Sequence, residues 1–220
     1  MKSNTCFAAS YSGGKDSILA IYRAIRRGFT PFRLITTYDE KNQRSWFHSI
    51  PKSILNQAAD AMGIPLSIIK TEGERYAHDF EAELRALKEL GVNTCVFGDI
   101  DIQEHFDWCD SRCRNAGINS YFPLWQESRK DLVYEFINCG FKAIITVVDS
   151  SRMDEGYVGQ ILTKELVQRI EDDGVDICGE NGEYHTFVFD GPIFHRPLDV
   201  SFGEAIKTDK YVRIPFISRT

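Results

Sequence analysis

The stretch TCFAASYSGGKDS, residues 5–17, decides the fold of this chain. Residues 5–11 are an apolar run typical of a buried strand, and the spacing of apolar residues over 18–25 predicts a helix. Between them lies the glycine-rich turn Ser12-Gly13-Gly14-Lys15-Asp16-Ser17. Glycines let the backbone approach a ligand, while the free N–H groups and the dipole of the following helix favour an anion. The stretch predicts a phosphate site, although an ordinary turn between a strand and a helix is the simpler interpretation.

The hexapeptide also indicates which phosphate chemistry to expect. Its spacing is not that of the P-loop, because no Gly-x-x-x-x-Gly-Lys-Ser/Thr is present. It resembles instead the PP-loop of the ATP pyrophosphatases, which cleave ATP between its α and β phosphates. The resemblance implies that the whole turn binds ATP and that its lysine also acts in catalysis; the residues concerned are Ser12, Gly13, Gly14, Lys15, Asp16 and Ser17.

Strand and helix patterns alternate outward from this stretch. Strands are predicted at 5–11, 32–38, 66–70, 94–97 and 143–148, and helices at 16–27, 53–62, 76–90, 105–115 and 130–138. Such alternation predicts a parallel sheet covered by helices on both faces. The last third changes character, with a helix expected at 159–171, a strand at 187–189 and a closing edge strand at 211–217.

These patterns predict an α/β fold: a doubly wound parallel sheet with a smaller C-terminal α+β subdomain. We place a PP-loop ATP-binding domain at residues 1–125 and a substrate-binding subdomain at 126–220. Ligands of such sheets bind at the carboxyl ends of the strands. Thr37 and Gly98 lie at such ends and are expected near adenosine. Asp16 or Asp99 is the expected Mg²⁺ contact, because Mg²⁺ takes one or two carboxylates plus phosphate oxygens; Asp16 could equally cap the following helix.

A second polar segment, residues 179–186, lies far along the chain. Two carboxylates and an imidazole stand within six residues, at Glu180, Glu183 and His185, beside tight glycine turns. Such a set could position an amine, take a proton from ammonia or help hold Mg²⁺, whereas a solvated hairpin loop is the simpler interpretation. The neighbouring candidates for substrate binding are Asn181, Gly182, Tyr184 and Thr186.

Four segments together resemble one family, the diphthine–ammonia ligase family of N-type ATP pyrophosphatases. They are residues 12–17, 98–100, 122–125 and 179–186 together with 190–192, and they follow one another along nearly the whole chain. The resemblance implies ATP-dependent amidation of the diphthine carboxylate on a modified histidine of translation elongation factor two. AMP and pyrophosphate are the implied by-products, and the implied catalytic residues are Lys15, Glu180, Glu183 and His185. We see no extra domain that could serve as a glutaminase, so free ammonia is the simpler nitrogen source to expect.

One departure from the family motif leaves the acceptor open. The motif is commonly written Glu-Gly-Gly-Glu-Phe/Tyr-Glu-Thr, and this chain has Asn181 for the first glycine and His185 for the second glutamate. The departure resembles the branch found in bacteria, which lack diphthamide. The same chemistry on another carboxylate is therefore one alternative. A PP-loop enzyme that modifies tRNA and a nucleotide sensor without turnover are two others.

Composition sets the remaining expectations. The chain has 220 residues, 43% of them hydrophobic, and a net charge of −6, which argues against a broad basic surface for nucleic acid. No leader is visible in residues 1–4, and no apolar run is long enough to span a membrane. The six cysteines form no Cys-x-x-Cys pair, which favours reduced thiols and a cytoplasmic location. A metal site at His105, Cys109 and Cys113 is a weaker alternative to packing, and a homodimer is left open.

Overall fold

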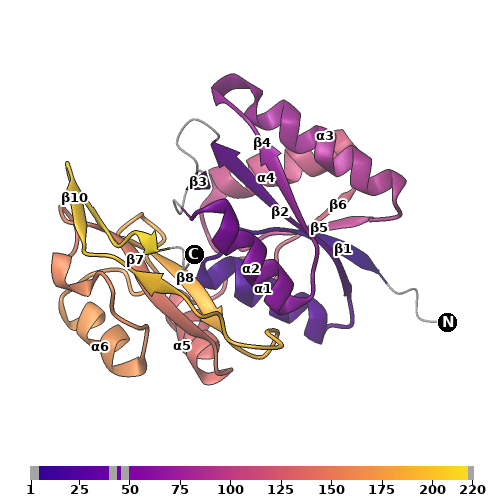
Figure 1. The fold of residues 1–220 in the computed structure, drawn as a ribbon. Helices are drawn as coiled ribbons and strands as arrows, with labels where there is room; N and C mark the ends of the chain where they lie inside the picture. The colour runs from indigo at the N-terminus through magenta and orange to yellow at the C-terminus, as the bar shows by residue number, and fades with distance from the viewer. Residues whose placement is uncertain (1–4, 40–43, 46–49, 218–220) are drawn as a thin grey trace.

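The computed structural model of the chain describes residues 5–39, 44–45 and 50–217. Its larger sheet has five parallel strands in the order β4-β2-β1-β5-β6, and the short β3 pairs antiparallel with the end of β2 (Figure 1). The strands are β1 (Cys6–Ser10), β2 (Thr30–Asp39), β3 (Arg44–Ser45), β4 (Leu66–Lys70), β5 (Thr94–Val96) and β6 (Asn119–Tyr121). The predicted parallel sheet is confirmed.

Helices cover both faces of this sheet. α1 (Lys15–Arg26) and α2 (Lys52–Met62) lie on one face, and α3 (Tyr76–Glu89) and α4 (Gln103–Ala116) on the other, with a 3₁₀ turn at Gly73–Arg75 before α3 (Figure 1). Strand β1 shows the cause, because successive side chains point to opposite faces. Phe7 and Ala9 join the core with α1 and α2, whereas Ala8 joins the core with α3 and α4. The doubly wound fold is confirmed.

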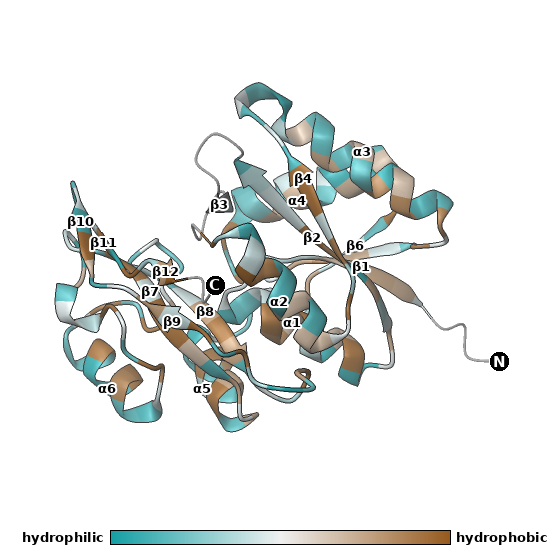
Figure 2. Cartoon of the chain, in the orientation of Figure 1, coloured by the Kyte–Doolittle hydropathy of each residue, from teal (hydrophilic) through white to brown (hydrophobic). Residues whose placement is uncertain are grey.

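The C-terminal part is built on a separate antiparallel sheet, as an α+β part requires. Its order is β10-β11-β7-β8, and α5 and α6 flank it (Figure 1). A two-stranded pair, β9 and β12, lies outside this sheet (Figure 2). The elements are α5 (Arg129–Asn138), β7 (Lys142–Asp149), a 3₁₀ turn at Glu155–Tyr157, α6 (Lys164–Asp172), β8 (Tyr184–Asp190), β9 (Ser201–Phe202), β10 (Ile206–Thr208), β11 (Tyr211–Arg213) and β12 (Phe216–Ile217).

Two expectations for this part differ from the structure. The helix expected at 159–171 begins only at Lys164, because Gly159 has a φ of +81° and Thr163 caps the helix by accepting a hydrogen bond from the Leu166 N–H. The edge strand expected at 211–217 is two strands, β11 and β12, in different sheets. Its first half, β11, lies inside the sheet between β10 and β7.

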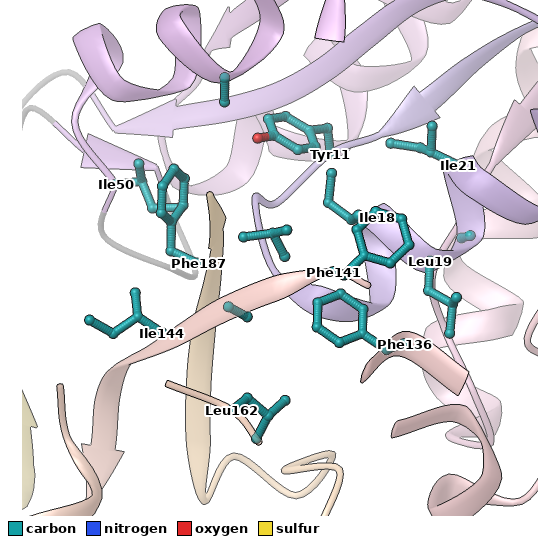
Figure 3. Packing of buried hydrophobic residues seen from close by; sticks show 14 of the residues in the cluster. Tyr11, Ile18, Leu19, Ile21, Ile50, Phe136, Phe141, Ile144, Leu162 and Phe187 are labelled. Atoms are coloured by element: carbon teal, nitrogen blue, oxygen red, sulfur yellow. The ribbon is translucent and has the colours of Figure 1, made fainter. Parts of the chain in front are cut away.

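One hydrophobic core joins the two parts of the chain. Tyr11 and Ile18 from the first part share a buried cluster with Phe141 and Phe187 from the second, and Ile50 packs beside them (Figure 3). Hydrophobic residues run along strands of both sheets in Figure 2. This core crosses the domain boundary predicted at residue 125. The boundary itself stays a prediction.

The described residues also bear on membrane association and on the cysteines. Within the described ranges, the helices are too short or too polar to cross a membrane. Residues 1–4, on which the expectation of no leader depends, lie outside these ranges. The six cysteines are free thiols, four of them buried.

Candidate active site

The glycine turn lies at the point of the larger sheet where the order of strand addition reverses. Strand β1 leads through α1 to β2 on one side, whereas its other neighbour, β5, leads through α4 to β6 on the far side. The connections from the carboxyl ends of β1 and β5 therefore run in opposite directions. Gly13 takes a φ of +84°, which suits glycine, and Gly14 is the N-cap of α1. The turn therefore presents the N-terminus of α1 at the position where sheets of this kind bind ligands.

Hydrogen bonds of Ser12 and Ser17 stabilise the conformation of the turn. The Gly14 N–H donates a hydrogen bond to Ser12 Oγ at 3.2 Å, and Ser12 Oγ donates to Ser17 Oγ at 3.2 Å. Ser17 Oγ in turn donates to the Gly14 carbonyl at 2.9 Å. These hydroxyls fix the backbone of the loop. Asp16 lies in the first turn of α1 and does not cap the helix, since Gly14 occupies the cap without a side-chain bond.

Gly98 brings the end of β5 against this turn. A Cβ at Gly98 would lie 2.7 Å from the Ser17 backbone nitrogen and 2.8 Å from the Asp16 carbonyl carbon. No side chain fits there, so glycine allows the segment that carries Asp99 to pack on the first turn of α1. The structure thus brings Gly98 to the turn, as expected for residues at neighbouring strand ends.

The second polar segment docks directly onto the glycine turn. The Lys15 N–H donates to Thr186 Oγ1 at 3.0 Å, and the Val188 N–H donates to the Gly13 carbonyl at 2.9 Å. Lys15 Nζ donates to the Cys178 carbonyl and lies 5.5 Å from the centre of the Tyr184 ring. Segments about 170 residues apart in sequence therefore form one site.

Charged groups gather around Lys15. Its Nζ lies 2.8 Å from Asp16 Oδ2, and burial alone would lower the pKa of Lys15. Asp16 and further acidic neighbours outweigh burial and raise this pKa well above its usual range, so Lys15 is a cation. Burial raises the pKa of the Glu180 carboxyl to about 8, and Asp16 adds to the rise while Lys15 opposes it. Glu180 therefore exchanges its proton near neutral pH.

The pKa values of His185 and Asp99 are shifted in opposite directions. Burial, with a further contribution from Lys15, lowers the pKa of His185, which keeps the imidazole neutral near pH 7. Burial raises the pKa of Asp99, and His105, whose Nδ1 lies 3.7 Å from Asp99 Oδ1, opposes that rise. The site thus combines a buried cation, a neutral imidazole and two carboxyls, Asp99 and Glu180, whose pKa values are raised.

Other expected site residues are engaged within the protein. Both oxygens of the buried Glu183 carboxylate accept hydrogen bonds from Asn181, one from its backbone N–H and one from its side-chain amide, each at 3.1 Å. The Tyr184 hydroxyl donates to the Ile177 carbonyl at 2.5 Å. Thr37 Oγ1 donates to the Tyr76 hydroxyl at 3.3 Å. These contacts shape the loop and the strand end around the site.

The donor set fits a hard divalent cation at one place. One ligand atom from each of Asp16, Cys178 and Glu180 lies within 4.8 Å of the others. The two carboxylates suit Mg²⁺, whereas the thiol does not. Among the residues that the structure describes, Asp99 is not part of this group, although its charge acts on Glu180. Nor do His105, Cys109 and Cys113 form a group of this kind there.

Sequence reasoning missed part of the site. The Asp176 carboxylate accepts hydrogen bonds from the N–H groups of Cys178 and Glu180, at 3.1 and 3.0 Å, and Arg129 donates to it from α5. An aspartate that bonds the backbone two residues on is a known turn device. Asp176 could have been found by that pattern, whereas no local pattern reveals its pairing with Arg129.

The fold and the site together define an α/β protein whose glycine turn is of the PP-loop type. The family models for the N-terminal and C-terminal domains of diphthamide synthase match residues 5–120 and 128–214. The chain belongs to the diphthamide synthase family, and it is accordingly an enzyme of the ATP-dependent ligase class.

The relatives found by sequence agree with this assignment. The chain is 26% identical to proteins named diphthine–ammonia ligase from Mus musculus and Homo sapiens, over 90% of this chain and 84% of each relative. It is 23% identical to the protein of that name from Danio rerio, over 95% of this chain and 92% of the relative. A solved structure described as a predicted subunit of tRNA methyltransferase from Methanocaldococcus jannaschii is 18% identical, with a TM-score of 0.45, and the match covers 86% of this chain and 98% of that one.

Proposed function

We propose that this enzyme adenylates a substrate carboxylate with ATP and then amidates it with ammonia. The observation that supports this most is the docking of residues 176–188 on the glycine turn, with Thr186 on the Lys15 N–H and the Cys178 carbonyl on Lys15 Nζ. The turn proposed to bind phosphate therefore contacts the segment proposed to bind the acceptor and ammonia. Placing the reactants is a large part of catalysis in such reactions.

The first step is an exchange of groups at the α-phosphorus. A carboxylate oxygen forms a bond to that phosphorus, and the bond to the bridging oxygen of the β-phosphate breaks, which releases pyrophosphate. The N-terminus of α1 and the Lys15 cation stabilise the negative charge that the leaving pyrophosphate gains. Mg²⁺, held by Asp16 and Glu180, would neutralise phosphate charge further.

The second step forms the amide. Ammonia attacks the acyl carbon, AMP leaves with the former carboxylate oxygen, and the nitrogen gives up a proton. His185 is our proposed acceptor of that proton, because its lowered pKa keeps the ring neutral near pH 7. Glu183, with both oxygens on Asn181, holds the loop in shape and is a positioning residue in this scheme.

The relatives are named diphthine–ammonia ligase, and this name supports diphthine as an acceptor. We propose the diphthine carboxylate of elongation factor two as the first acceptor to try, with other carboxylates as alternatives because of Asn181 and His185. The free thiols also support a reducing compartment such as the cytoplasm.

The test follows oxygen atoms and nucleotides. The enzyme is incubated with ATP, Mg²⁺, ¹⁵N-ammonium and diphthine-bearing elongation factor two whose carboxylate carries ¹⁸O. We expect AMP that contains ¹⁸O, pyrophosphate, and an acceptor that contains ¹⁵N. Release of ADP, or AMP without ¹⁸O, would overturn the adenylation step. AMP formed with tRNA as acceptor would support the tRNA-modifying alternative, and nucleotide binding without turnover on any acceptor would support the sensor.

A further inference from the structure

Arg129, the first residue of α5, ties together two loops that carry site residues. Its Nε and Nη2 donate to the two oxygens of Asp101 at 2.7 and 2.6 Å, and its Nη1 donates to Asp176 Oδ2 at 2.5 Å. Asp101 belongs to the segment after β5 that carries Asp99, and Asp176 belongs to the segment between α6 and β8 that carries Glu180. One guanidinium thus connects the first part of the chain with the second.

Asp176 connects Arg129 with the backbone of the segment that carries Cys178 and Glu180. Its Oδ1 accepts from the Cys178 N–H and its Oδ2 from the Glu180 N–H, so its carboxylate sets the turn over 176–180. The same turn directs the Cys178 carbonyl to Lys15 Nζ. Arg129 is therefore linked to the Lys15 cation in three steps. Arg129 donates to the Asp176 carboxylate, the Cys178 N–H donates to the same carboxylate, and Lys15 Nζ donates to the Cys178 carbonyl.

We propose that Arg129 is a positioning residue for the ligase reaction, which fixes the turn carrying Glu180 against Asp16 and Lys15. The inference rests on the proposed function. Three of the five N–H donors of Arg129 are directed at the carboxylates of Asp101 and Asp176. Arginine suits the task, since its planar fork can bind one carboxylate with two bonds and still reach a second, whereas lysine offers a point charge.

The test compares Arg129→Ala and Arg129→Lys with Lys130→Ala. Lys130 follows on the same helix and pairs on the surface with Glu171 at 2.6 Å, so its variant removes an equal charge away from the site. With the acceptor assay, we expect Arg129→Ala to lower kcat about 10- to 100-fold and to change KM for ATP much less. Arg129→Lys should recover little of the loss, and Lys130→Ala should behave like the wild type.

Hydrogen–deuterium exchange gives a second readout that needs no turnover. In Arg129→Ala, amides of residues 177–183 should exchange faster, while those of α3 and α4 keep the wild-type rate. If the wild type forms no AMP, the proposed function fails and the exchange result still decides the role of Arg129. Unchanged kcat and exchange, full rescue by Arg129→Lys, or faster exchange throughout the chain would each overturn the positioning role.

Discussion

In the proposed reaction, we expect the chemistry of the site to depend most on Lys15. Its ammonium lies among Asp16, the Cys178 carbonyl and the Tyr184 ring, and it is almost fully buried. A buried cation placed before the reaction begins stabilises developing phosphate charge more strongly than a solvated one. We expect Lys15→Met to lower the rate of AMP formation about 100-fold or more. Lys142→Met, which removes an exposed lysine paired with Asp190, is the control and should retain activity.

Nucleotide analysis by chromatography measures this effect, and circular dichroism checks that both variants are folded. Activity of Lys15→Met within threefold of the wild type would contradict the role of the cation.

Glu180 makes stability depend on pH in an unusual direction. Its pKa in the folded chain is raised to about 8 by burial and then by Asp16, from an ordinary value of 4.5. Between these values the folded state keeps a proton that the unfolded state releases, so stability falls as pH rises through this window. Glu180→Gln should therefore have a higher Tm than the wild type at pH 8 and a similar Tm below pH 4.5.

Thermal unfolding from pH 4 to 9 in EDTA tests this. The difference in Tm should grow up to about pH 8 and then level off, and Mg²⁺ should reduce it because a cation favours the ionised carboxylate. A difference that is constant with pH would show that Glu180 does not titrate in this window.

At the level of single residues, local sequence patterns predict the conformation of the glycine turn well. Gly13 and Gly14 were expected to bend the chain before α1, and the structure places them there. The partners of Lys15 were not predictable in detail, because Thr186 and the Cys178 carbonyl are about 170 positions away. The roles proposed for the individual site residues stay predictions until the variants are measured.

Among the elements, the segment after β5 packs so closely on the start of α1 that no side chain fits between them. A methyl group at Gly98 would meet backbone atoms of Asp16 and Ser17 at less than 3 Å. Because backbone cannot move aside as a flexible side chain can, we expect Gly98→Ala to displace the first turn of α1. Stability should fall by about 1–3 kcal/mol and KM for ATP should rise.

Gly140→Ala is the matched control for this substitution. Gly140 follows α5, has a φ of +87°, and has no atom within 4 Å of a new Cβ. It should lose about 1 kcal/mol through backbone strain and leave KM for ATP unchanged. Urea unfolding and ATP titration of both variants separate the two effects. Equal KM values in Gly98→Ala and the wild type would contradict the packing argument.

Element prediction succeeded where local patterns were strong and failed where pairing decides the structure. The helix expected at 76–90 is α3, which runs Tyr76–Glu89. By contrast, the three-residue strand β6 was not foreseen, because its segment is too short to show an alternation. Residues 211–217 carry a strand pattern throughout, yet β11 and β12 pair with different partners, and only tertiary contacts decide that.

Over the whole molecule, the site exists only because two separate sheets meet. The glycine turn comes from the parallel sheet, and its partner β8 comes from the antiparallel one, with Val188 bonded to the Gly13 carbonyl. The alternation of strands and helices was enough to predict the first sheet. The meeting of the sheets was not predictable, because the Phe187 side chain packs against residues that are far away in sequence (Figure 3).

This shared core predicts that residues 1–125 do not form an independently stable domain. Without residues 126–220, Tyr11, Ile18 and Ile50 lose the cover of Phe141 and Phe187. Each large apolar side chain exposed costs about 1.5–3 kcal/mol, and the total stability of a domain is about 5–15 kcal/mol. We expect fragment 1–125 to unfold at a much lower temperature than the full chain, or without a cooperative transition.

Thermal unfolding followed by two spectroscopic signals, together with co-expression of the two fragments, tests whether the first part is stable on its own. All three tryptophans precede residue 126, so their fluorescence follows the first part, while far-UV circular dichroism follows the whole chain. In the full chain both signals should change at one temperature, and co-expression of fragment 126–220 with fragment 1–125 should restore that transition. If fragment 1–125 alone unfolds at the temperature of the full chain, the two parts are independent domains and the shared core does not stabilise the phosphate turn.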